Sequence, residues 1–395
     1  MTNLALNRPA DMSSTSRWSK YADSSKEASI GNNGDISDEV FFHSDIENNP
    51  WWQVDLGDIY NINRIKIFNR SDQKDKCKAF KILWSSDGET YFTLYRRTSA
   101  NRFNELDLSF DVEMAARYVR VQLLGHNFLH LREIEIYGAK VPIVEAERIL
   151  KQAADNDPAS HLYQGREGHF VQIGIAEIFN DQKYSKEISN ALEARRYEHS
   201  ERHLVADFLR PDDKLLEIGT AVGAVSMTAA SIIGPENVIT FDANPEIVAD
   251  ACANFAYNGL GTITSHTGIL KNRAQFKPGE NVDFYISHAF WASRMFIGGS
   301  KDDIIKTVSV PTFCLEDEIA KFGATVIVCD IEGGEVELLH GADLSRIRLI
   351  IIETHYWAAG EREVDDMMGY LINQGFSLHL GASKNHVSVL RRHSS

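Results

Sequence analysis

The chain lacks several features that would place it outside ordinary globular folds. It has no run of 18 apolar residues, so the sequence predicts no transmembrane helix. Its first 14 residues lack the basic stretch and apolar core of a signal peptide, and we therefore expect a cytoplasmic protein. The four cysteines form no C-x-x-C pair and have no zinc-knuckle spacing, so we expect reduced thiols.

Positive charge is scarce as well. The chain holds 41 Lys+Arg against 56 Asp+Glu, a formal net charge of -15, and most of the acidic excess follows residue 140. Such a field repels polyphosphate, which argues against nucleic acid as a main partner. The length of 395 residues favours two domains, and 43% apolar with 25% charged residues is typical of a globular chain. Nothing in the pattern indicates an oligomeric state.

The first 138 residues alternate between short apolar-polar strands and polar turns, the pattern of an all-β sandwich or barrel. Ser86-Asp87-Gly88 reads as a hairpin turn between strands at 81–84 and 91–94. The other expected strands have one apolar and one polar face, and they are 52–56, 63–68, 118–123 and 132–137.

From about Val141 the apolar period becomes helical, with helices expected at 143–150 and 188–209. Strands and helices then alternate, as in a mostly parallel sheet covered by helices on both sides. The expected strands are 215–218, 238–241, 326–329, 349–352 and 376–380. The sequence thus predicts a multidomain chain: an all-β jelly-roll sandwich at 1–139, a helical connector at 140–195 and an α/β Rossmann-like domain at 196–395.

A glycine turn follows the first strand of the second domain. Glu217-Ile-Gly219-Thr-Ala-Val-Gly223 opens a helix, whose N-terminal N–H groups can face a carboxylate or phosphate. Asp242 ends the next strand, where a carboxylate can grip two vicinal ribose hydroxyls. The E-x-G-x-x-x-G spacing fits S-adenosylmethionine better than NAD. The alternative is a plain strand-to-helix connection.

Several ordered motifs over roughly residues 195–392 resemble the FkbM type of S-adenosylmethionine-dependent methyltransferase. They are Phe241-Asp-Ala-Asn-Pro245, Asn254 with Asn258-Gly259-Leu260, Val328-Cys-Asp-Ile-Glu-Gly-Gly-Glu335 and Ile351-Ile-Glu-Thr-His355. The resemblance implies O-methylation, often of a sugar hydroxyl. It also implies cofactor-binding residues: Glu217, Gly219, Thr220 and Gly223 at the methionine part, Asp242 at the ribose, and Asn244 beside it.

A hydroxyl is a poor nucleophile at neutral pH, so transfer to oxygen needs a general base, a metal, or both. Asp330, Glu353 and His355 follow two parallel strands, at the carboxyl edge where ligands bind. His355 is the first choice for the base because its unperturbed pKa lies near neutral. Glu332, Glu335 and Glu353 with Asp330 could form a magnesium site. Alternatively, some of them cap the helix near Gly333 or pair with Arg346 and Arg348.

The first domain contains a second set of motifs. Asn3 to Ala10 and Asn49-Pro-Trp-Trp-Gln-Val-Asp-Leu-Gly57 resemble the discoidin-like jelly rolls, particularly the fucose-binding F-type lectins. His43, Arg70 and Asp72 match the H-x26-R-x-D pattern of these lectins. A histidine and an arginine can donate to a sugar, and the aspartate can hold the arginine.

Two departures from that pattern concern cysteine. The family has a basic residue where this chain has Cys77, so its neighbours Lys76 and Lys78 are the candidates for the third sugar contact. The adjacent-cysteine disulfide of the family is absent. Many discoidin-like domains have the same scaffold without the pocket, which is the alternative interpretation.

A segment rich in Asn, Gly and Asp resembles the calcium loop of these lectins, and carboxylates and carbonyls are the ligands that calcium prefers. The residues implied are Asn32, Asp35, Ser37, Ser44, Arg132 and Glu133. Such a stretch can also be an ordinary turn.

These patterns lead to one hypothesis and its rivals. We expect a carbohydrate O-methyltransferase that acts on a fucose-containing glycan held by the lectin domain. The rivals are a lectin with an inactive second domain, and a methyltransferase for a non-glycan acceptor. The acidic run at 198–201 is read as a solvated face or as part of the acceptor cleft.

Overall fold

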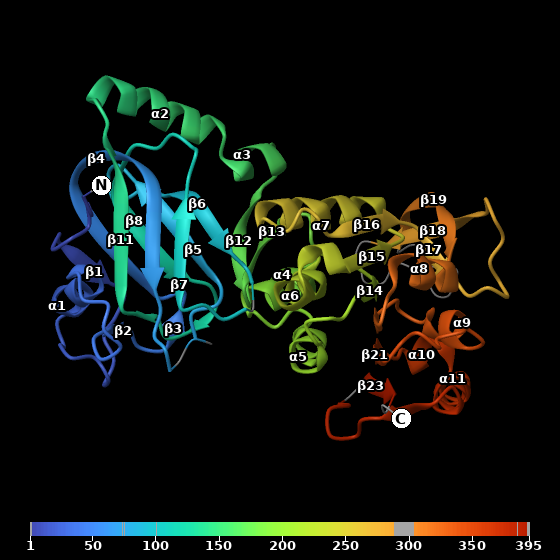
Figure 1. Ribbon diagram of the computed structural model, residues 1–395. Helices are drawn as coiled ribbons and strands as arrows, with labels where there is room; N and C mark the ends of the chain where they lie inside the picture. Colours follow the sequence, from blue (N-terminus) through green and yellow to red (C-terminus); the bar gives the residue numbers. More distant parts are fainter. Residues whose placement is uncertain are drawn as a thin grey trace. The chain divides into compact units, whose positions relative to one another are not determined.

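The computed structural model describes residues 2–72, 74, 76–99, 101–287, 304–384 and 386–392. The chain divides into two compact units, residues 1–164 and 165–395, which are described separately (Figure 1). The first is a β-sandwich and the second an α/β domain, as the sequence predicted. Every helix among the described residues is too short or too polar to span a bilayer.

The first unit contains two main sets of strands that share one long strand. Its larger elements are β1 (Ala10–Met12), α1 (Ser24–Ala28), β2 (Phe42–His43), β4 (Trp51–Phe68), β5 (Phe80–Ser85), β6 (Phe92–Arg97), β7 (Glu105–Ser109), β8 (Ala116–Leu123), β10 (His130–Leu131), β11 (Glu133–Lys140), α2 (Ile143–Asp155) and α3 (Pro158–Leu162). Short strands β3 (Glu47–Asn48) and β9 (His126–Asn127) pair with each other.

Strand β4 connects the two sets. We expected two separate strands at 52–56 and 63–68, but β4 runs through both. Its first part pairs with β1 and β8, and its second part pairs with β11 and β7. Gly57, at φ 78°, lies between the two parts, and its N–H donates to Asp55. The strand therefore changes partners at Gly57 without ending, which builds a sandwich around Trp52 and Phe80.

The second unit has a sheet in the order β16-β15-β14-β20-β21-β23-β22, parallel except where β23 pairs with its neighbours. These strands are β14 (Leu215–Ile218), β15 (Val238–Asp242), β16 (Thr264–Thr267), β20 (Val326–Cys329), β21 (Leu349–Glu353), β22 (Phe376–Leu378) and β23 (Val387–Arg392). A separate set contains β17 (Ile269–Lys271), β18 (Asn281–Ser287) and β19 (Ile304–Cys314).

Helices cover both faces of this sheet. Along β14, Leu215 joins one core cluster and Leu216 the other, and Val326 and Ile327 of β20 alternate in the same way. Runs that are apolar on both faces are thus buried on both faces. The helices are α4 (Lys186–Glu193), α5 (His199–Phe208), α6 (Ala224–Ile233), α7 (Pro245–Tyr257), α8 (Leu315–Phe322), α9 (Glu335–Leu339), α10 (Tyr356–Ala359) and α11 (Glu361–Asn373).

Two local features differ from the sequence expectations. The helix expected at 188–209 is broken between α4 and α5, where Arg195 and Glu198 have positive φ angles of 58° and 46°. The segment expected to be a helical connector also contains a hairpin of β12 (Gly168–Ile173) and β13 (Ala176–Asp181), turning at Gly174 with φ 61°. Apolar alternation in these two short strands supports the hairpin over a helix.

The asparagines of the FkbM-type motif attach this hairpin to α7. The side chain of Asn258 accepts from the N–H of Glu177 and donates to its carbonyl, at 2.9 and 2.7 Å. Asn254 accepts from the N–H of Phe179 and donates to the carbonyl of Val222. These side chains therefore satisfy the edge of β13 and the glycine turn from one helix.

Candidate active site and sugar pocket

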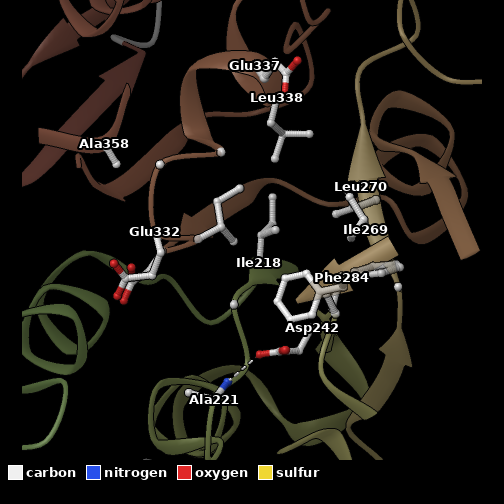
Figure 2. A pocket seen from close by; sticks show the side chains of 18 of the residues that line it. Ile218, Ala221, Asp242, Ile269, Leu270, Phe284, Glu332, Glu337, Leu338 and Ala358 are labelled. Carbon is white, nitrogen blue, oxygen red and sulfur yellow. Dashed lines mark hydrogen bonds between the residues drawn. The ribbon is translucent and has the colours of Figure 1, made fainter. Parts of the chain in front are cut away.

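A cavity of about 1210 Å³ lies at the carboxyl ends of β14, β15 and β20 in the second unit (Figure 2). Parallel sheets of this kind bind ligands at this edge. One part of its lining is apolar and includes Ile269, Leu270 and Phe284, while Glu332 lies apart from them in Figure 2. The cavity thus has an apolar end and an acidic end.

The glycine turn can only be built with glycine at its two ends. Gly219 has φ 95°, and a Cβ there would overlap the carbonyl oxygen of Asp330. Gly223 has φ 87°, and a Cβ there would overlap the ring of Phe255. Ala221, between them, is held at φ 45°, which is strained for a residue with a Cβ. The turn is therefore a fixed, tightly packed wall of the cavity.

Asp242 closes this turn against the next strand. Its carboxylate accepts from the N–H of Ala221 at 3.1 Å, drawn in Figure 2, and from the N–H of Asn244 at 2.8 Å. Burial raises the pKa of Asp242, and backbone hydrogen bonds oppose this shift. Asp242 lines the cavity beside Phe284, so its carboxylate is available to a ligand there.

The other expected cofactor residues support the turn from behind, and Gly219 and Asp242 are the two of the six that line the cavity. Glu217 is buried, accepts from the Ser226 hydroxyl, and burial raises its pKa to about 8. The hydroxyls of Thr220 and Thr240 bond to each other. Asn244 caps α7 by accepting from the N–H of Glu246.

Four carboxylates surround His355 at the acidic end. His355 is 2% exposed, and its Nδ1 lies 2.6 Å from a carboxylate oxygen of Glu335. Its Nε2 lies 3.6 Å from Asp330, 3.3 Å from Glu332 and 4.0 Å from Glu353. The structure therefore brings the three expected catalytic residues together. Arg348, which might have paired with this group, pairs instead with Asp213.

The charged groups of this cluster shift one another's pKa values. Burial raises the pKa of Glu332 to about 7 and raises that of Asp330 well above its usual range, and Glu353 and Glu332 add to the shift at Asp330. Burial lowers the pKa of His355, but Glu335, Glu332 and Asp330 outweigh this and raise it to about 9. Without a bound cation the cluster therefore favours the protonated ring, which weakens the reason for making His355 the first choice of base, and that role stays a prediction.

Three of these residues also have an arrangement that suits a cation. Donor atoms of Asp330, Glu332 and His355 all lie within 4.8 Å of one another. Glu335 holds the opposite ring nitrogen of His355 and also accepts from the N–H of Gly333 at 3.1 Å. Glu332 has a positive φ of 55°, a strained conformation that often marks functional sites.

The break between α4 and α5 contributes Tyr197, which sequence reasoning missed, and Glu198, from the acidic run for which a place in the acceptor cleft was one of two readings. Both line the cavity, and burial raises the pKa of Glu198 well above its usual range. Glu201 is buried and lies close enough to raise the pKa of Glu353. The acidic run at 198–201 is therefore not a solvated face. The signal was the charge run itself, but the helix break that turns Glu198 inward has no sequence marker.

In the first unit, aromatic rings lie beside both His43 and Arg70. Arg70 makes a two-pronged ion pair with Asp72, at 2.9 and 2.7 Å, and its guanidinium lies 3.8 Å from the centre of the Phe41 ring. The rings of Phe128 and His130 lie 5.1 and 5.4 Å from that of His43. Asp72 thus fixes the arginine fork, as the spacing predicted.

The hydrogen bonds of His43 assign its role. Its Nδ1 lies 2.6 Å from the carbonyl oxygen of Ser44, so this nitrogen must carry the proton. Burial lowers the pKa of His43, and nearby Arg70 lowers it further. The neutral ring then presents Nε2 as an acceptor. We had expected His43 to donate to a sugar; in this tautomer it accepts, and Arg70 is the donor.

The residues around the third contact are arranged differently. Cys77 is fully buried in the sandwich core, and burial raises the pKa of its thiol to about 12. It is therefore an inert core residue. Lys76 and Lys78 are half-buried on either side of it. The carbonyl of Lys78 accepts from Arg97 at 2.6 Å, and among the described residues neither lysine hydrogen-bonds to His43.

The expected calcium residues fall into two groups. Glu133 is fully buried, and neither of its carboxylate oxygens has a hydrogen-bond partner among the described residues. Burial raises its pKa to about 8, with nearby Glu135 and Asp35 adding to the shift; the backbone N–H groups of Gly34 and Asn33 oppose it from close by without reaching hydrogen-bond geometry. The buried Oδ1 of Asn32 also lacks a partner in the described part of the chain, although its Nδ2 donates to the carbonyls of Ala5 and Arg8.

The remaining members of that set already have partners. Asp35 is exposed and accepts from the N–H of Ser37. The Ser44 hydroxyl donates to the carbonyl of Asp45 and accepts from the N–H of Leu129. Arg132 donates to the carbonyls of Asn69 and Ile36 and pairs with Asp38, so it holds the segment from Ile36 to Asp38 in place and is not free to bind a metal ion.

Comparisons with known proteins agree with this division. Residues 31–121 match the family model of the NedA-like, galactose-binding domain of F5/F8 type C, and residues 217–378 match that of the methyltransferase FkbM domain. The chain thus carries a galactose-binding-type domain followed by an FkbM methyltransferase domain. A search of the curated proteins gave no match.

Solved structures similar to this chain match about a third of it. The lectin domain of lectinolysin complexed with Lewis B antigen is 26% identical over 35% of this chain and 98% of its own, with a TM-score of 0.29. A fucose-binding module of Streptococcus pneumoniae is 22% identical over 35% and 95%, with a TM-score of 0.30. A serum f-lectin of striped bass, Morone saxatilis, is 26% identical over 36% and 50%, with a TM-score of 0.32.

Proposed function

We propose that this protein transfers the methyl group of S-adenosylmethionine to a hydroxyl of a glycan, and that its N-terminal domain holds this glycan. A fucose-containing glycan is the first candidate. The observation that carries the proposal is a single cavity joining the Gly219 turn and Asp242 to the Asp330, Glu332 and His355 cluster. The first group suits a nucleoside cofactor, and the second suits proton removal from a hydroxyl.

The cofactor supplies an electrophilic methyl group on a sulfonium. In the transfer, the acceptor oxygen bonds to the methyl carbon, the carbon–sulfur bond breaks, and its electron pair stays on the sulfur of S-adenosylhomocysteine. The hydroxyl proton must go to a base of the protein. We assign this role to Glu332 or Asp330, because Glu332 has a pKa of about 7 and both line the cavity. His355 and the positioning residue Glu335 hold these carboxylates in place.

The same residues fit a magnesium ion. Asp330 and Glu332 would contribute oxygens and His355 its Nε2, with the other ring nitrogen held by Glu335, as in many metal sites. One buried oxygen of Asp330 has no hydrogen-bond partner in the described residues, which supports this fit. A divalent ion there would acidify the acceptor hydroxyl and would offset the excess of carboxylates.

We also propose that calcium stabilises the N-terminal domain at Asn32 and Glu133. A buried carboxylate with neither oxygen bonded is costly, and a hard cation would satisfy it together with the Asn32 oxygen. The His43 and Arg70 pocket would then bind a fucose-like sugar and raise the local concentration of the glycan for the catalytic domain. The cytoplasmic location expected from the sequence stays a prediction.

The rival is a lectin whose second domain is inactive or methylates a non-glycan acceptor. Free L-fucose separates these cases in a methylation assay with a fucosylated oligosaccharide. We expect fucose to inhibit turnover by the wild type and to leave that of Arg70→Ala unchanged at its lower level. Turnover that is insensitive to fucose in the wild type would remove the recruiting role, and no turnover on any glycan would favour the rival.

A further inference from the structure

Two aromatic side chains lie next to the acidic end of the cavity. Tyr356 and Trp357 begin α10, immediately after His355, and are 40% and 57% exposed. Single exposed apolar residues are common on protein surfaces. Trp357 is different because it lines the cavity with Ala358 and Glu332, and its ring centre lies 5.0 Å from that of His355.

We expect the cofactor and the acceptor at different ends of the cavity. Asp242 and Phe284 lie together in Figure 2, near Ile269, so the ribose and the adenine fit the apolar end. Glu332 and Ala358 lie on another side of the same view. Trp357 lines the cavity and its ring centre lies 5.0 Å from that of His355, so it belongs to the acidic end, where we expect the acceptor.

The chemistry of Trp357 suits a sugar ring. An indole offers a broad apolar face, and the rings of His355, Tyr356 and His386 lie 5.0 to 5.1 Å from that of Trp357 and nearly perpendicular to it. The C–H face of a pyranose can cover such a ring while its hydroxyls donate to carboxylates. Asp330, Glu332 and Glu198 line the same cavity and can accept from those hydroxyls.

We propose that Trp357 is the platform on which a pyranose ring of the acceptor stacks. The inference rests on the proposed function and specifies the residue that positions the acceptor at its catalytic site. Trp357 binds the ring, while the carboxylates beside it take the hydroxyl that reacts.

The experiment is carried out on the full chain with Arg70→Ala, which disables the N-terminal pocket so that sugar binding reports the catalytic site. The probes are methyl β-D-galactopyranoside, methyl α-L-fucopyranoside and galactitol, a polyol without a ring, each with S-adenosylhomocysteine present. Binding is followed by saturation-transfer NMR. Trp357→Ala and Trp357→Phe are added in turn, and Ile372→Ala is the control, since Ile372 is an exposed apolar residue of α11 that does not line the cavity.

We expect at least one glycoside to bind, with a signal about 10-fold weaker in Trp357→Ala, because the apolar face that the ring covers is lost. The signal should be partly kept in Trp357→Phe and unchanged in Ile372→Ala. Galactitol should give no signal. Equal signals with and without Trp357, galactitol that binds as well as the galactoside, or no sugar binding at all would each overturn the inference. Calorimetry of S-adenosylmethionine on the same variants tests the proposed function separately.

Discussion

The two candidate sites of this chain balance charge in opposite ways. In the N-terminal pocket, Arg70 has its own counter-ion in Asp72, and His43 is neutral, so the charges of these side chains are balanced without a ligand. In the C-terminal cavity, one imidazolium faces Asp330, Glu332, Glu335 and Glu353. The first arrangement suits recognition without chemistry. The second holds carboxylates at raised pKa values, as sites that move protons do.

Backbone strain also differs between the two candidate sites, and it is greater at the C-terminal cavity. Six described residues other than glycine have positive φ angles, and three of them, Glu198, Ala221 and Glu332, line the cavity. The others are Arg195 and, in the first unit, Asn7 and Asn49, a residue type that tolerates this conformation. His43, Arg70 and Asp72 have no such angle. Strain of this kind persists only where the surrounding structure holds it, and it is concentrated here at the site with the perturbed charges.

The largest effect is expected from Gly219→Ala. The new Cβ would overlap the carbonyl oxygen of Asp330, so the turn must shift and the cofactor site is lost. We expect no detectable heat from S-adenosylmethionine in calorimetry and a lower melting temperature. Gly341→Ala is the matched control: its φ of 91° is similar to the 95° of Gly219, but nothing lies within 4 Å of its Cβ position. If both variants bind the cofactor, the turn is not part of its site.

Arg70→Ala should break the N-terminal pocket alone. The loss of a charge-assisted contact costs about 1.5–3 kcal/mol, which is roughly a 10- to 100-fold loss of affinity for L-fucose. Arg64→Ala serves as the control, because Arg64 makes a similar two-pronged pair with Asp107 on an exposed face of the same unit. A titration of fucose into both variants measures the difference. Equal affinities would show that the sugar binds elsewhere.

Calcium should stabilise the N-terminal unit through Glu133. At a calcium concentration about 100-fold above its Kd we expect about 3 kcal/mol of stabilisation, which is a rise of roughly 6–10 °C in its melting temperature. Glu133→Gln should abolish the rise, since the amide offers no charge. A melting temperature that calcium leaves unchanged in the wild type would contradict the proposed site.

The smallest effect is a pH dependence of the C-terminal unit in the presence of a chelator. The folded pKa of His355 is about 9 and lies above its unfolded value of about 6.5, so its contribution is present below pH 6.5 and is lost as the pH rises through 9. The raised pKa of Glu332, about 7, acts in the same direction, because the folded state binds the proton more tightly. Melting curves from pH 6 to 9 should show a falling stability. Glu335→Gln should flatten the curve, and a rising one would contradict the charge assignment.

Both domains and most of their strands could be predicted from the sequence, because alternation and both-face burial leave a local pattern. Asp330, Glu353 and His355 could be placed at one sheet edge for the same reason. The break at Arg195 and Glu198 could not, since only tertiary contacts hold those residues at positive φ. The neutral tautomer of His43 and the raised pKa of His355 could not be predicted either. The first depends on local backbone geometry, and the second depends on carboxylates from other segments of the chain.

The central claim is that two independent sites serve one reaction, and calorimetry tests it most directly. S-adenosylmethionine and L-fucose are titrated separately into the wild type, Asp242→Ala and Arg70→Ala. We predict that Asp242→Ala loses only the heat of the cofactor and Arg70→Ala only that of fucose. A wild type that takes up fucose but gives no heat with the cofactor would contradict the account and leave a sugar-binding protein with a silent second domain.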